Sequence, residues 1–206
     1  MTGRVRIRDS LAFGWRTFRL NTLFFIVLLL LIGATLAIPG VLLRRLPPGD
    51  ANLSRFLLEA ALWALRALAA MVVIIVSLSF LDRGTIDMDR LKHMRPVFVP
   101  YIIGSFILLS LISLGVALFV VPGVYIAVRY QFMPYLIIDR EMRPVQAFKA
   151  AGVMTRGLWL ELFLLLLCIA GLNALGAIPL GLGLLITVPV TALAHAMIYR
   201  DLVSWP

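Results

Sequence analysis

The sequence predicts an all-α integral membrane bundle of six transmembrane helices, arranged as three helical hairpins with short amphipathic cytoplasmic interfacial helices. Composition is the first observation behind this class. Hydrophobic residues make up 62% of the 206 residues and charged residues 14%, whereas a soluble domain has about 45–50% and about 25%. The second observation is the length of the uncharged stretches, because about 20 helical residues cross a hydrocarbon core of about 30 Å.

The uncharged stretch 96–128 contains 33 residues, and the apolar sequence continues past Arg129 to residue 138. As one helix it would be roughly twice as long as the core is thick, at about 1.5 Å per residue. The chain must therefore turn back. We expect the turn at Pro122-Gly123, because proline removes a helix donor and glycine tolerates turn conformations.

The remaining spans follow from the same reasoning. The stretch 162–199 is also long enough for two crossings, and Pro179–Gly183 is the expected turn between them. The first span should end before Pro39-Gly40. We expect one six-span domain over 1–206, with spans at about 22–38, 61–81, 98–121, 124–138, 159–178 and 182–199.

Lysine and arginine counts predict the orientation. Fourteen of these residues lie at the termini or in connections on the side of the termini, whereas the opposite side has only Arg44, Arg45 and Arg55. Since positive residues favour the cytoplasmic side, we expect both termini in the cytoplasm and the chain in the inner membrane. The net charge of +9 then reflects topology rather than a nucleic-acid partner.

Short segments with helical character precede the expected hairpins. Residues 1–20 form the first, in which Leu11, Trp15 and Phe18 share one helix face, and similar segments occupy 86–94 and 144–157. Apolar residues three and four apart with basic neighbours suit helices that lie in the headgroup layer.

An ordered set of short motifs runs through the chain. They are VPGVYIAVRY at 121–130, PYLIID at 134–139, PVQAF at 144–148, MTRG at 154–157, TVPVT at 187–191 and YRDL at 199–202. With them the chain resembles a prokaryotic family of six-span membrane proteins of unknown function, related to the membrane domain of some glycerophosphodiester phosphodiesterases. The resemblance implies the six-helix architecture. It implies no activity, because the phosphodiesterase chemistry of those relatives belongs to a separate soluble domain.

Residues for catalysis or metal binding are scarce. One cysteine and two histidines, His93 and His195, are too few for a Cys/His zinc cluster. Asp82, Asp87 and Asp89 could offer oxygens to a divalent ion, but their spacing matches no known binding loop. We therefore expect no enzyme, no cofactor and no metal site.

A candidate intramembrane polar site comprises Arg129, Gln131, Glu59, Asn173 and His195. A charge at the depth expected of Arg129 costs about 2.5–3.5 kcal/mol on insertion, so it should face the bundle interior and be paired. Glu59, Asn173 and carbonyls freed by Pro134 are the candidate partners. Arg129 is then either a structural clamp or a contact for an anion or lipid phosphate in an outward cavity.

Two functions remain open from the sequence. The first is a non-enzymatic scaffold or accessory subunit that interacts with membrane lipids and with a membrane-protein partner or a second copy of the chain. The alternative is a small transporter or lipid-handling protein with a polar site around Arg129. Discontinuous helices near mid-membrane indicate transport sites, but the predicted breaks lie mainly at the outer ends, which favours the scaffold.

Overall fold

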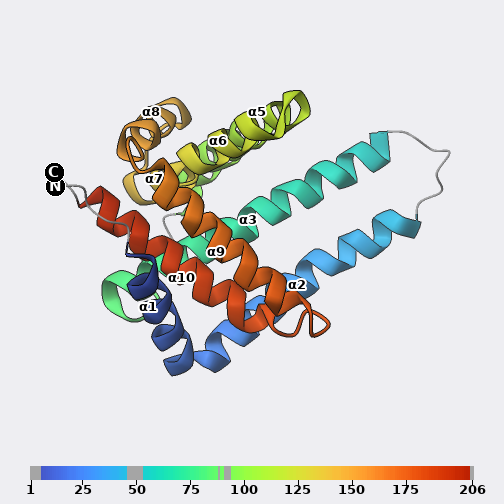
Figure 1. Cartoon of the computed structure of the whole chain (residues 1–206). Coiled ribbons are helices and arrows are strands. Elements are labelled where there is room, and N and C mark those ends of the chain that lie inside the picture. Colours follow the sequence, from blue (N-terminus) through green and yellow to red (C-terminus); the bar gives the residue numbers. More distant parts are fainter. Residues whose placement is uncertain (1–5, 46–52, 88, 91–93, 205–206) are drawn as a thin grey trace.

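The computed structural model describes residues 6–45, 53–87, 89–90 and 94–204, and in these residues the regular structure is helical. The prediction of an all-α chain is confirmed. Figure 1 shows the helices: α1 (Ile7–Leu20), α2 (Thr22–Arg45), α3 (Leu53–Arg83), α5 (Met94–Leu118), α6 (Val120–Tyr130), α7 (Met133–Arg140), α8 (Pro144–Met154), α9 (Trp159–Ala177) and α10 (Leu184–Val203).

The predicted number of six spans is wrong. Three helices in the described part of the chain are long and apolar enough to cross a membrane, namely Arg55–Arg83 of α3, α5 and α9. A fourth candidate arises only if α1 and the segment Thr22–Thr35 of α2 count as one span, and these two are bent by 92° relative to each other. The described residues therefore contain three or four candidate spans.

Two of the predicted spans are not candidate spans in the structure, for reasons that lie in their local sequence. The expected span 124–138 is divided between α6, with 11 residues, and α7, with 8. At about 1.5 Å per residue, α6 is only about 16 Å long, roughly half the hydrocarbon core. The expected span 182–199 corresponds to α10, whose polar His195 and charged Arg200-Asp201 lower its hydropathy.

The predicted turn at Pro122-Gly123 is displaced. The chain turns at Phe119, which has an extended backbone, and the Pro-Gly pair lies in the first turn of α6, where proline is tolerated. A Cβ atom added to Gly115 of α5 would lie 2.8 Å from the Cα of Gly123. This close backbone approach between α5 and α6 is why glycine is needed at both positions.

Of the two other predicted helix breaks, the structure has the one at Pro179–Gly183 but not the one at Pro39-Gly40. Residues 178–183 form a turn between α9 and α10, as predicted, and Leu180 and Gly181 adopt positive φ angles there. By contrast, α2 continues through Pro39-Gly40 to Arg45, so the helix does not end where the first span was predicted to end. The expected hairpin pairs nevertheless form, because α2 packs on α3, α5 on α6, and α9 on α10.

Helix α10 organises the bundle. It packs against α1, α2, α3 and α9, and Leu193, Ala194, Ala196 and Tyr199 are completely buried along it. Helix α1 crosses α10 closely, since a Cβ atom on Gly14 would lie 2.3 Å from the carbonyl oxygen of Val190. The α2–α3 hairpin extends away from this centre in Figure 1.

Helices α1 and α8 occupy two of the three expected amphipathic segments. The exposed side of α8 carries Val145, Lys149 and Val153, whereas Ala147 and Ala151 are buried. In α1, Phe18 is buried but Trp15 is half exposed, so the expected apolar face is only partly covered. The segment 86–94 lies partly outside the described residues.

Candidate functional site

Arg129 lies in the last turn of α6, half-buried between two tyrosines. Its Cζ atom is 5.7 Å from the ring centroid of Tyr125 and 5.9 Å from that of Tyr130. The guanidinium also donates a hydrogen bond to the Tyr125 hydroxyl. The Arg129 Nε atom is buried and has no hydrogen-bond partner among the described residues, although a buried donor normally has one.

A cavity of about 70 Å³ lies beside Arg129, where the end of α8 leads into α9. An outward cavity was expected at Arg129, and the side of the membrane that this cavity faces stays a prediction. Thr155 fixes this junction, because its hydroxyl approaches the carbonyl oxygen of Arg129 at 2.9 Å. The lining residues are Tyr125, Val128, Arg129, Thr155, Arg156, Gly157, Trp159 and Leu162.

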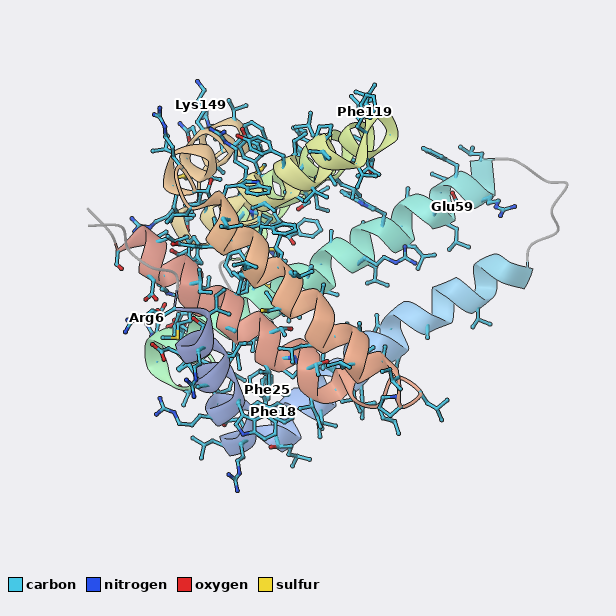
Figure 2. All side chains as sticks on the ribbon, in the orientation of Figure 1. Arg6, Phe18, Phe25, Glu59, Phe119 and Lys149 are labelled. Atoms are coloured by element: carbon cyan, nitrogen blue, oxygen red, sulfur yellow. The ribbon has the colours of Figure 1, made fainter. Side chains whose placement is uncertain are left out.

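Two proposed partners of Arg129 have other contacts. Glu59 pairs with Arg55 of its own helix at 3.4 Å, and its side chain is half exposed. Figure 2 shows Glu59 toward the free end of the α2–α3 hairpin. The Asn173 amide donates to the Thr191 hydroxyl at 3.4 Å, connecting α9 with α10.

Gln131 and His195 lie together, although they are 64 residues apart. The Nε2 atom of His195 is 2.9 Å from the Gln131 Oε1 atom, and its Nδ1 atom is 3.3 Å from the Tyr135 hydroxyl. Because Oε1 can only accept, Nε2 is the donor, and Nδ1 then accepts from Tyr135 in a neutral imidazole. The ring also packs 4.7 Å from Phe132, so His195 joins α10 to the α6–α7 break.

An ion network that was not predicted from the sequence lies at the end of α10. Arg200 donates to both carboxylate oxygens of Asp139, at 2.7 and 2.8 Å, and to both oxygens of Asp82, at 3.0 and 2.6 Å. Tyr199 donates to Asp139 at 3.0 Å, and Arg90 reaches Asp82 at 2.7 Å. Asp139 lies in the PYLIID motif and Arg200 in the YRDL motif. Each charge is also typical of a solvated helix end, so the motifs alone did not indicate that the two residues pair.

This network connects three helices, α3, α7 and α10. Burial alone would lower the pKa of the Arg200 guanidinium. The hydrogen bonds and the attraction of Asp82 and Asp139 outweigh burial, so that pKa is raised above its ordinary value. Bidentate arginine–carboxylate pairs are among the stronger hydrogen-bonded contacts in proteins.

A second cavity, of about 320 Å³, lies beside this network. Its lining combines acidic and basic side chains, and Asp87 is buried with a contact of 3.1 Å to Arg83. Within the described residues no group of three or more His, Cys, Asp or Glu side chains is placed to hold a metal ion. His93 lies outside the described residues.

The fold defines a class before any relative is considered: a helical protein with several candidate membrane spans. The family model described as "Protein of unknown function (DUF975)" matches residues 53–205, and the chain belongs to this family. The match agrees with the resemblance to a family of unknown function, but it shows no link to glycerophosphodiester phosphodiesterases. No curated protein and no solved structure matches the chain.

Proposed function

We propose that the protein is a non-enzymatic, multi-pass protein of the inner membrane that acts as a scaffold or accessory subunit for other membrane proteins. One observation carries this proposal. Several polar side chains of the bundle bond to other side chains within it, as in the pairs His195–Gln131 and Asn173–Thr191. The outer surface of the bundle, which would face lipid or a partner helix, is then largely apolar.

The exposed apolar surface is extensive on α5 and α9. Phe106 and Leu114 of α5 are about three-fifths exposed, and Leu160, Leu164 and Leu167 form an exposed stripe on α9. Exposed apolar surface of this kind contacts lipid or a partner helix. Leucines at spacings of three and four residues lie on one helix face and can pack against a neighbouring helix.

We also propose that both termini lie in the cytoplasm. The excess of Lys and Arg on that side supports this orientation. The hairpin geometry is compatible with it. In Figure 1 the free end of the α2–α3 hairpin and the α5–α6 and α9–α10 junctions point away from α7, α8 and the end of α10.

The second candidate function, a small transporter or lipid-handling protein, is supported by the cavity beside Arg129. Transport requires a route through the membrane to a polar site, and this cavity has only about 70 Å³ at one helix junction. Its lining does include two arginines, Arg129 and Arg156. The cavity therefore supports recognition of an anion better than it supports transport.

A gentle-detergent purification with native mass spectrometry tests the scaffold proposal. We expect a stoichiometric membrane protein to copurify, and reciprocal purification of that partner to recover the chain. Replacing Leu164 and Leu167 with Ala should weaken the complex about tenfold, whereas replacing Phe56 and Leu57 of α3, which are also exposed, should not. A mass of two copies would identify the partner as the chain itself. A monomer carrying only lipid would contradict the proposal.

A further inference from the structure

The cavity beside Arg129 differs from the other polar cavity in its charge. Arg129 and Arg156 line it, and none of the lining residues is acidic. The larger cavity, by contrast, includes Asp87, Asp139 and Glu141 with its arginines. Glu161, in the first turn of α9, is not one of the residues that line the Arg129 cavity. The smaller cavity therefore has a cationic lining.

The Arg129 guanidinium is held in place before any ligand arrives. Contacts with Tyr125 and Tyr130 fix its plane, and its backbone carbonyl is bonded by Thr155. Because Tyr125 accepts a hydrogen bond from Arg129, its own O–H remains able to donate. A fixed guanidinium loses less side-chain entropy on binding an oxyanion than a free one does.

The start of α9 adds backbone donors at the same junction. The backbone hydrogen bonds of α9 begin with Leu162 N–H to the Leu158 carbonyl, at 3.0 Å, and Leu158 provides no side-chain cap. The N–H groups of residues 159 and 160 therefore have no carbonyl within the helix to bond. Trp159, the first residue of α9, also lines the cavity. A helix N-terminus attracts anions and has N–H groups that can bind phosphate oxygens.

Size and location indicate the kind of anion. A water molecule needs about 10–15 Å³ of such a cavity, so about 70 Å³ accommodates a group of several heavy atoms. Tryptophan is enriched at the level of lipid headgroups, and Trp159 lies beside the exposed Arg156. Exposed Val153 on the adjoining helix α8 is compatible with a position at the membrane surface.

We propose that this cavity binds the phosphate group of an anionic phospholipid headgroup. Arg129 is the inner cation, Arg156 is the outer cation, and the first N–H groups of α9 complete the set of donors. The inference rests on the second candidate function and is independent of the scaffold proposal, since copurification of a protein partner and lipid binding are measured separately.

The test uses the full chain, purified in detergent and stripped of lipid, with binding measured by native mass spectrometry. The probes are phosphatidylglycerol, phosphatidylcholine and inorganic phosphate. Arg156→Gln and Arg129→Lys should each weaken phosphatidylglycerol binding about tenfold, because arginine binds oxyanions through paired donors that glutamine and lysine cannot reproduce. Lys149→Gln is the matched control. It removes the same charge from α8, and in Figure 2 Lys149 points away from the bundle.

The proposal is supported if phosphatidylglycerol binds more tightly than phosphatidylcholine and only the two arginine variants lose this preference. Inorganic phosphate that binds through the same arginines at least as tightly as phosphatidylglycerol would overturn the lipid headgroup as the source of the group, whereas tighter binding of phosphatidylglycerol supports the headgroup. Equal losses in Lys149→Gln and Arg156→Gln would overturn the proposal, because binding would then follow general surface charge. Unchanged binding in both arginine variants would overturn it as well. Arg156→Gln changes an exposed side chain, so this arm does not depend on how the bundle tolerates changes at Arg129.

Discussion

Arg200 and Arg129 each lie in the last turn of a helix, but their surroundings differ. Arg200 is bonded by Asp82 and Asp139, which come from two other helices. Arg129 contacts one tyrosine hydroxyl and two aromatic rings. Arg200 therefore holds helices together, whereas we propose that the charge of Arg129 is available to a ligand.

The difference shows how an arginine's role depends on what neutralises it. Two carboxylates satisfy most of the Arg200 donors and join α3, α7 and α10. At Arg129, ring contacts orient the guanidinium without neutralising it, because a cation–π contact leaves the charge in place. Three substitutions test this distinction.

The largest effect is expected for Asp139→Asn. The Asp139 side chain is only 6% exposed and bonds both Arg200 and Tyr199. Removing one partner of a buried ion pair costs about 3–5 kcal/mol. Because Asp82 remains and Arg200 is partly exposed, we expect a loss of about 2–3 kcal/mol in unfolding free energy. Detergent-phase unfolding measures this loss. Arg140→Gln is the control, since Arg140 is 52% exposed at 3.7 Å from Asp139 and should change little.

A smaller loss is expected for Thr155→Val, which keeps the side-chain volume but removes the hydroxyl. The hydroxyl contacts the carbonyls of Arg129 and Ala151 at 2.9 and 2.8 Å. We expect a loss of about 1 kcal/mol in unfolding free energy and weaker binding at the cavity. Thr35→Val is the comparison, because its exposed hydroxyl bonds only Leu31 in the same helix. Equal losses in both variants would show that the hydrogen bond from Thr155 to the Arg129 carbonyl adds no stability beyond that of a bond within one helix.

The smallest effect is expected for Arg129→Leu. This change removes a hydrogen bond to a partly exposed tyrosine and two ring contacts, and it also removes a buried Nε that lacks a partner. These terms offset one another, so unfolding free energy should change by no more than about 1 kcal/mol. Unfolding of purified Arg129→Leu protein provides the measurement. A loss of unfolding free energy as large as that of Asp139→Asn would show that Arg129 also holds helices together. Arg129 and Arg200 would then have the same structural role.

Parts of the fold could be predicted from local sequence. Composition predicts helices in an apolar medium, and Leu180-Gly181 lies where the Pro179–Gly183 turn was expected. Pro122-Gly123 misled the prediction, because proline is as acceptable in the first turn of a helix as it is in a connection. The turn at Phe119 depends on the contact of Gly115 with Gly123, and this contact exists only once α5 and α6 pack.

The candidate site shows the same division. Arg129 was a candidate because it is a charged residue in an apolar stretch of sequence. The structure places a cavity beside it. Glu59 was expected as a partner because both residues are charged, but local pairing with Arg55, one turn away on α3, engages it. The Arg200 network was not predicted, because Asp82 and Arg200 are 118 residues apart and each resembles an ordinary helix-end charge.

The sequence by itself determined that the chain is helical, strongly apolar and basic, since these properties depend on composition and local residue preferences. Tertiary structure decided which helices are long enough to cross a membrane, which arginine clamps the bundle and which one borders a cavity. The physical reason is that burial and neutralisation of a charge depend on residues distant in sequence, and packing alone determines which of them meet.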